Sequence, residues 1–181
     1  MKFFLIIAAI LGLAPLASAE DWPMWRGDAQ RSGSTATDLP ADLHLQWTRE
    51  LPAPRPAWEN EDRLHFDTSY HPVVTGKTLV IASPNDGSVM AFDTDTGSET
   101  WRFFTNGPVR LAPVAAGGKV FAGSDDGYLY CLDAKSGEEI WKVRAAPKDR
   151  PEYRHLGNGR LVSFWPVRGG PVLSEHVKTL Y

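Results

Sequence analysis

Short apolar runs separated by glycine-containing corners dominate the chain between residues 72 and 145. Runs of β-branched and aromatic residues that are bounded by turn residues are typical of strands. After the first 19 residues, no stretch of ten or more has the periodicity of a helix. We therefore expect six short strands, at residues 78–82, 88–93, 99–104, 119–122, 128–133 and 139–143.

Two kinds of corner connect the expected strands. The Asp-Gly pairs at residues 86–87 and 126–127 suit a type I′ turn, because Gly takes positive φ freely and Asp tolerates it. The pairs Thr96-Gly97 and Ser136-Gly137 form the second kind of corner. The pattern predicts two antiparallel meanders whose middle strands are apolar on both faces.

The two meanders are copies of one unit at an offset of 40 residues. Repeats with a period of roughly 20–50 residues indicate stacked supersecondary units, and about 40–45 residues make a four-stranded propeller blade. Six of 18 aligned positions are identical: Asp86/Asp126, Gly87/Gly127, Asp93/Asp133, Gly97/Gly137, Glu99/Glu139 and Trp101/Trp141.

Incomplete units flank these two copies. Residues 170–181 repeat the opening of each copy, but no corner and no tryptophan follow, whereas Leu45–Arg49 looks like the closing strand of an earlier unit. We expect an N-terminal fragment, an open arc of a propeller. Its expected parts are a signal peptide (1–19), a lead-in with a part-blade (20–71), two repeats (72–145), an insertion (146–169) and the start of a further repeat (170–181).

The closing part of each repeat resembles a known motif. Residues 91–101 fit the pattern Ala-x-Asp-x-x-Thr-Gly-x-Glu-x-Trp at every fixed position, and residues 131–141 fit it with Cys for Ala and Ser for Thr. This resembles the tryptophan-docking motif of PQQ-like (pyrroloquinoline quinone-type) β-propellers. Residues 21–28 are similar to the segment that precedes the first blade in such proteins, and Trp47 matches the tryptophan after it. The resemblance implies an all-β fold, a partial β-propeller of four-stranded antiparallel blades.

The motif residues have architectural tasks that follow from their chemistry. An indole offers a wide apolar face and an N–H that seeks a carbonyl oxygen. An aspartate before a turn accepts hydrogen bonds from backbone N–H groups, and glycine allows positive φ. We expect the structural docking set to be Asp93, Gly97, Glu99, Trp101, Asp133, Gly137, Glu139 and Trp141.

The first 19 residues have the pattern of an export signal. Lys2 precedes an apolar run of 11 residues, and Ala17-Ser18-Ala19 is a small-residue cleavage site. The run is too short for a transmembrane anchor, which needs about 20 residues. No cysteine lies near the cleavage site for a lipid anchor. We expect cleavage after Ala19 and a periplasmic or secreted mature chain with no membrane span.

Composition argues against several functions. The chain has 19 Lys and Arg against 22 Asp and Glu, so it lacks the basic excess of a nucleic-acid-binding protein. Enzymatic quinoproteins bind the quinone with calcium and use an aspartate base, and many carry a disulfide between adjacent cysteines. Here Cys131 is the single cysteine, and its place in an expected strand indicates a small buried hydrophobe. The five histidines have no metal-ligand spacing. We predict no catalytic residue, metal site or cofactor.

The insertion at residues 146–169 is not explained by the repeat. It mixes four arginines with Tyr153, Phe164 and Trp165. Guanidinium groups bind carboxylates or phosphates, and aromatic rings stack on ligands. The alternative is a loop that covers a blade edge or pairs with the acidic residues of a blade. The candidate ligand or partner contacts are Arg154, Asn158, Arg160, Trp165 and Arg168.

These observations favour an exported, non-catalytic PQQ-like propeller-repeat protein that acts as a scaffold or an interaction module. The non-enzymatic branch that it resembles includes an outer-membrane assembly factor. The expected partners are another protein or the remaining propeller blades. The alternative is a fragment of a PQQ-dependent quinoprotein dehydrogenase, which would bind PQQ with calcium. A WD40-like scaffold shares the period, but its Gly-His and Trp-Asp signatures are absent.

Overall fold

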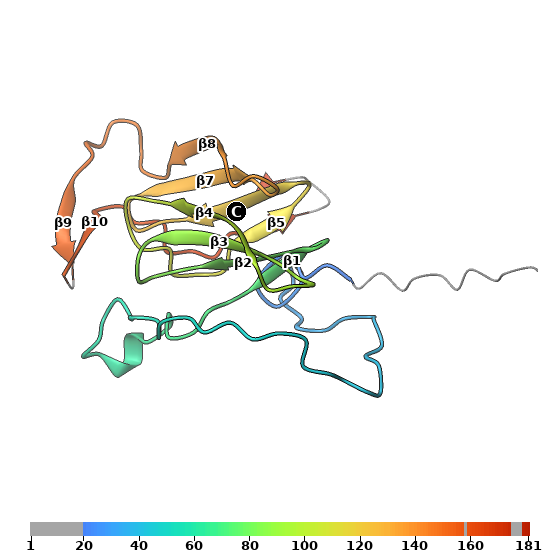
Figure 1. Cartoon of the computed structure of the whole chain (residues 1–181). Helices are drawn as coiled ribbons and strands as arrows, with labels where there is room; N and C mark the ends of the chain where they lie inside the picture. The colour runs from blue at the N-terminus through green and yellow to red at the C-terminus, as the bar shows by residue number, and fades with distance from the viewer. Residues whose placement is uncertain (1–19, 158, 175–178) are drawn as a thin grey trace, which may run out of the picture.

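The structure, a computed structural model, describes residues 20–157, 159–174 and 179–181. The expected signal peptide (1–19) and Asn158 lie outside the described residues. Figure 1 shows two stacked sheets, with the lead-in segment passing beneath them.

Two four-stranded antiparallel sheets form the body of the molecule, and in each sheet consecutive strands are hydrogen-bonded neighbours. β1 and β5 are in contact, so the two meanders lie against one another through their first strands. All six strands predicted from the sequence are confirmed to within one residue. The first sheet contains β1 (Val73–Thr75), β2 (Thr78–Ala82), β3 (Ser88–Asp93) and β4 (Glu99–Phe104), and the second contains β5 (Val114–Ala116), β6 (Lys119–Gly123), β7 (Tyr128–Asp133) and β8 (Glu139–Arg144).

Smaller elements flank the two sheets. The insertion contains a hairpin of β9 (Arg154–Gly157) and β10 (Arg160–Ser163). The expected start of a further repeat pairs β11 (Leu173–Ser174) with β12 (Thr179–Leu180), as β1 pairs with β2 in the first sheet. Among the described residues, the 3-10 helix η1 (Asp62–Leu64) is the single helix.

The Asp-Gly corners differ from the expected type I′ turn. Gly87 and Gly127 have φ of 71° and 94°, but Asp86 and Asp126 are not among the residues with positive φ. The corner between β6 and β7 is a three-residue loop that ends on the left-handed Gly127. In this loop the Gly127 N–H donates to the Ser124 carbonyl over 3.1 Å. Such a loop matches the twist of a hairpin with one left-handed residue instead of two. The type I′ prediction is therefore wrong.

The expected closing strand at Leu45–Arg49 is also wrong, because this segment has no strand partner among the described residues. Two side chains hold it instead. The Gln46 side chain donates to the Asp95 carbonyl, and the Trp47 indole N–H donates to the Thr94 carbonyl, each over 2.8 Å. A strand needs a neighbour in a sheet, and docking by side chains does not supply one.

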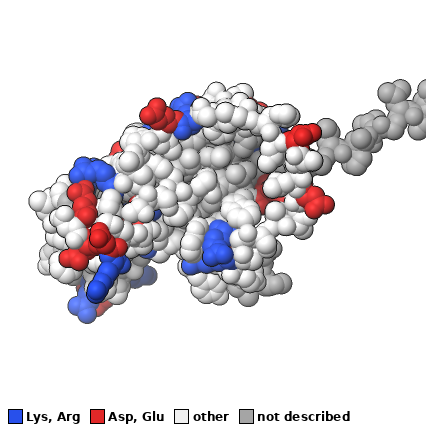
Figure 2. Space-filling model, turned by 90° about the horizontal axis from the view of Figure 1, so that it is seen from below, with Lys and Arg blue, Asp and Glu red and all other residues white. Residues whose placement is uncertain are grey.

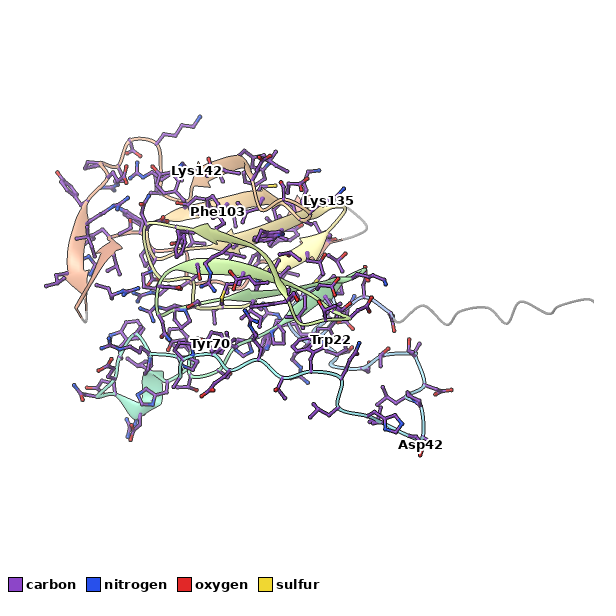
Figure 3. The ribbon with its side chains drawn as sticks, in the orientation of Figure 1. Trp22, Asp42, Tyr70, Phe103, Lys135 and Lys142 are labelled. Atoms are coloured by element: carbon purple, nitrogen blue, oxygen red, sulfur yellow. The ribbon has the colours of Figure 1, made fainter. Side chains whose placement is uncertain are left out.

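The core lies between the two sheets. Residues 88–92 of β3 are buried, as predicted for a middle strand that is apolar on both faces. Phe103 of β4, labelled in Figure 3, packs edge-on against Tyr130 of β7 with ring centroids 5.5 Å apart. Cys131 is fully buried in β7, and burial raises the pKa of its thiol. The reading of this cysteine as a buried hydrophobe is confirmed.

Candidate functional site

Trp101 docks onto the glycine corner of the second sheet. Its Nε1–H donates to the Ala134 carbonyl over 3.0 Å, and its side chain is buried. A Cβ placed on Gly137 would lie 2.6 Å from the indole ring. The ring therefore rests where any other side chain would stand, and glycine is needed both for this approach and for its φ of 74°.

Trp47 makes the same contact with the first sheet. Its Nε1–H donates to the Thr94 carbonyl, and a Cβ on Gly97 would lie 2.6 Å from its ring. Each glycine corner thus receives the tryptophan of the preceding unit. Trp141 stands at the same place in the second repeat but is 40% exposed, against 8% for Trp101, because no further four-stranded sheet follows it among the described residues.

The motif aspartates close the corners on which the indoles rest. Asp93 accepts hydrogen bonds from the amide and hydroxyl of Thr96 over 2.8 and 2.9 Å, and these bonds hold the pKa of its carboxyl below the usual value. Asp133 accepts from the amides of Ser136 and Lys135 over 2.8 and 2.9 Å, with the same effect on its pKa. Both carboxylates therefore accept hydrogen bonds from residues of their own turns.

The motif glutamates lie on the surface of the outer strands. Glu99 pairs with Arg102 through two bonds of 2.7 and 3.0 Å, and this guanidinium lowers the pKa of the glutamate. Glu139 pairs with Lys142 at 3.4 Å. The eight residues of the docking set are thus distributed over two corners and two outer strands, and the structure does not gather them into one site.

Replacing Gly137 with alanine tests the indole contact. Gly137→Ala is expected to lower the free energy of unfolding by more than about 2 kcal/mol, because it combines left-handed backbone strain of about 1–2 kcal/mol with a collision against Trp101. Gly117→Ala is the matched control, since Gly117 has φ of 58° and no atom within 4 Å of a built Cβ. Urea unfolding of both variants measures the difference. Equal losses would show that the indole does not rest on Gly137.

A buried ionic cluster joins four segments of the chain, and sequence reasoning missed most of it. The Arg110 side chain, 5% exposed, donates from Nη1 to Asp67 and from Nε to Asp125, each over 2.7 Å. Asp125 also accepts two bonds from Arg168, over 2.8 and 3.1 Å. The side chains of Asp67 and Asp125 are at most 1% exposed. We call Asp67, Arg110, Asp125 and Arg168 the ionic cluster.

The ionic cluster connects the lead-in, the link between the sheets, the β6–β7 corner and the insertion. Asp67 also accepts the Ala57 amide over 2.9 Å, while its second oxygen, Oδ1, is buried with no partner among the described residues. One signal in the sequence could have found the cluster: Arg110 is a charged residue in an otherwise apolar stretch that leads into β5. The Asp-Gly pair at residues 126–127 marks the corner beside Asp125 but gives no sign of the ion pairs that Asp125 makes.

The structure does not gather the four described candidate contacts of the insertion, and Asn158 lies outside the described residues. Arg168 belongs to the ionic cluster and stacks over Trp58, with its guanidinium 4.6 Å from the ring centroid. Arg154 pairs with Glu152 at 3.2 Å. Trp165 is 43% exposed beyond the end of β10, and Arg160 lines a narrow gap beside the lead-in. Arg168 therefore makes the alternative contact, a pair with an acidic residue of a blade.

One largely apolar cavity of about 390 Å³ lies between the lead-in and the residues that precede β5. The lead-in contributes Trp25 and Phe66, and Leu111 and Ala112 line the other side. Trp25 forms one wall, in edge contact with His71, and Arg31 lies 4.9 Å from the Trp25 ring.

A calcium-linked quinone needs a set of oxygen ligands around the metal. In the part of the chain that the structure describes, no three His, Cys, Asp or Glu side chains converge to hold a metal.

No helix in residues 20–157, 159–174 or 179–181 combines the length and apolar character needed to cross a bilayer. Charged side chains of both signs gather at the end of the molecule that carries β9, β10 and η1, as Figure 2 shows from below.

Comparison with known proteins places the fold in a family. Over 108 residues the chain is 38% identical to outer membrane protein assembly factor BamB of Bordetella pertussis, which covers 58% of this chain and 27% of that protein. It is 42% identical over 59 residues to quinoprotein ethanol dehydrogenase of Pseudomonas aeruginosa, covering 32% of this chain and 10% of that one. The chain therefore spans about a quarter or less of the length of these relatives.

A solved structure has the same fold. Quinohemoprotein alcohol dehydrogenase of Comamonas testosteroni matches 75% of this chain and 21% of its own, with a TM-score of 0.52 and 24% identity. Residues 27–162, which include both four-stranded sheets, match the family described as outer membrane protein assembly factor BamB. Because this match takes in more than half of the chain, the protein belongs to that family of PQQ-like β-propeller repeat proteins.

Proposed function

We propose that the chain forms part of an exported, non-catalytic PQQ-like propeller that acts as a scaffold or interaction module. One observation carries the proposal: the side chains that define the repeat are engaged in corners, outer-strand ion pairs and blade docking. Trp101 and Trp47 contact glycine corners, and Asp93 and Asp133 accept bonds from their own turns. Repeat proteins use such residues for nearest-neighbour packing.

Export and assembly partners are part of the same proposal. The pattern of residues 1–19 supports cleavage after Ala19 and a periplasmic or secreted mature chain. The relative from Bordetella pertussis is named as an outer membrane protein assembly factor, which supports a protein partner or further blades for this chain. Neither a nucleic acid nor a membrane span enters the proposal. Expression with residues 1–19 in a Gram-negative host, followed by mass spectrometry, should give a mature chain that starts at Glu20.

A fragment of a PQQ-dependent quinoprotein dehydrogenase is the second candidate function. It is supported by 42% identity over 59 residues to a quinoprotein ethanol dehydrogenase. The candidate predicts that PQQ and calcium bind together. A quinone-dependent alcohol dehydrogenase matches 61% of the chain at 31% identity, whereas among the described residues no three His, Cys, Asp or Glu side chains converge on a metal.

Thermal unfolding of the mature chain with and without PQQ and Ca²⁺ tests the non-catalytic proposal. A ligand at 100 times its dissociation constant stabilises a protein by about 2.7 kcal/mol, which would raise the midpoint by several degrees. We expect an unchanged midpoint and no dye reduction with an alcohol substrate. A raised midpoint that requires both PQQ and Ca²⁺ would overturn the proposal, because it would place a cofactor site in this chain.

A further inference from the structure

The β9–β10 hairpin projects from the edge of the two sheets and is held at its base. Figure 1 shows it beside the sheets, joined to β8 and to the last residues by connecting segments. Among the described residues, its strands pair with one another and with no further strand. At the base, the Ser163 amide donates to the Asp125 carbonyl over 2.7 Å, and Val162 is buried. An isolated two-stranded hairpin is marginally stable in water, so this base fixes its position.

Apolar side chains are exposed on both faces of the hairpin. Leu156 and Leu161 lie opposite each other across the two strands and are 74% and 53% exposed. On the other face, Tyr153 and Phe164 are 63% and 65% exposed, and His155 contacts Phe164 edge-on with ring centroids 5.2 Å apart. Exposed apolar side chains that cluster in this way mark interaction surfaces.

The hairpin also has one free strand edge. The β10 side is occupied at its base by the bond between Ser163 and Asp125. In the described part of the chain, no backbone hydrogen bond joins the outer edge of β9 (Arg154–Gly157) to another segment. Unpaired N–H and C=O groups along an edge are a template for an added strand. A lipid surface or a nucleic acid cannot satisfy a row of backbone groups, but a polypeptide can.

The net positive charge of the insertion favours a partner segment with acidic side chains. Residues 146–169 contain five Lys and Arg against two Asp and Glu, whereas the whole chain has 19 against 22. Asp125 neutralises Arg168 at the base, but Arg154 is paired only with the half-exposed Glu152. A partner segment with acidic side chains would complement this excess, and apolar side chains between them would cover Leu156 and Leu161.

We propose that the β9–β10 hairpin binds a protein partner through an extended segment of alternating apolar and acidic residues, which adds a strand to the outer edge of β9. This inference rests on the proposed interaction function and names the chemistry of its partner. The apolar side chains of the segment pack on Leu156 and Leu161, and its carboxylates lie on the opposite face of the hairpin, which carries Arg160.

A labelled ten-residue peptide of alternating valine and glutamate is the probe, with fluorescence anisotropy as the measurement. We expect the peptide to bind the mature chain, and we expect its counterpart with lysine in place of glutamate to bind at least tenfold more weakly. A glutamate peptide that is N-methylated on alternate residues should also lose binding, because it cannot complete the strand ladder. Binding of the lysine and N-methylated peptides with the same affinity as the glutamate peptide would overturn the proposal.

Two variants test whether the peptide binds at the hairpin. Leu156→Glu should weaken binding of the glutamate peptide at least tenfold, whereas Leu45→Glu, at an 82% exposed leucine outside the hairpin, should not change it. Circular dichroism and urea unfolding verify that both variants stay folded. Equal binding by both variants, or binding to phosphatidylglycerol vesicles but to no peptide, would overturn the proposal. The thermal unfolding test with PQQ and Ca²⁺ uses the unmodified chain and a different readout. If the peptides fail to bind as expected, the non-catalytic proposal therefore still stands.

Discussion

Trp101→Ala is expected to lower the free energy of unfolding by about 3–5 kcal/mol, the range found when a large buried aromatic side chain is truncated. Trp101 is 8% exposed, fills the space over Gly137 and donates its N–H to the Ala134 carbonyl. Truncation opens a cavity between the two sheets and leaves that carbonyl without its donor. Urea unfolding followed by far-ultraviolet circular dichroism measures the loss.

Trp141→Ala is the matched control, because it removes the same residue from the same motif position. Trp141 is 40% exposed and contacts Phe121 in a tilted arrangement, with ring centroids 6.0 Å apart. We expect a loss of no more than about 2 kcal/mol, below that of Trp101→Ala, since a large part of the Trp141 side chain is already in water. If the two variants were equally destabilised, burial between the sheets would not be the source of the effect.

Asp125→Ala is expected to cost about 3–5 kcal/mol, because it removes the acceptor of two guanidinium groups and leaves the buried cluster with two positive charges against one carboxylate. Arg110 would keep Asp67 alone, and Arg168 would lose both bonds that fix the base of the insertion. We also expect faster proteolysis within residues 146–169, because this segment is no longer held to the β6–β7 corner. Urea unfolding and limited trypsin digestion measure the two effects.

Lys77→Ala removes an exposed ion pair and is the control for the ionic cluster. Lys77 and Asp95 are 2.5 Å apart, but their side chains are 77% and 55% exposed. Exposed pairs contribute little because water and salt screen them. The unfolding midpoint and the trypsin pattern should stay unchanged. An effect of Asp125→Ala no larger than that of Lys77→Ala would show that the cluster does not hold the insertion.

The strands and the repeated positions of the tryptophans could be predicted because each depends on local sequence. Apolar runs and glycine corners place the six strands, and the copy at an offset of 40 residues identifies Trp101 and Trp141 as equivalent. The type I′ turn was wrong because Asp-Gly also suits a longer loop with one left-handed residue. Loop length is set by strand register, which the dipeptide does not encode.

The ionic cluster and the hairpin could not be predicted because they depend on contacts between distant segments. Asp67 and Arg110 are 43 residues apart, as are Asp125 and Arg168, and no motif joins them. The segment at Leu45–Arg49 alternates apolar and polar residues like a strand but has no described partner in a sheet. The pattern predicts an extended conformation, whereas pairing requires a neighbour.

A double-mutant cycle between Trp101 and Gly137 tests the central claim most directly, namely that the repeated residues serve docking between blades. The claim predicts that Gly137→Ala costs less in the Trp101→Ala background, where only its backbone strain remains, as at Gly117. The expected coupling measured by urea unfolding is about 1–3 kcal/mol, the size found for residues in contact. Costs that add within about 0.5 kcal/mol would contradict the claim.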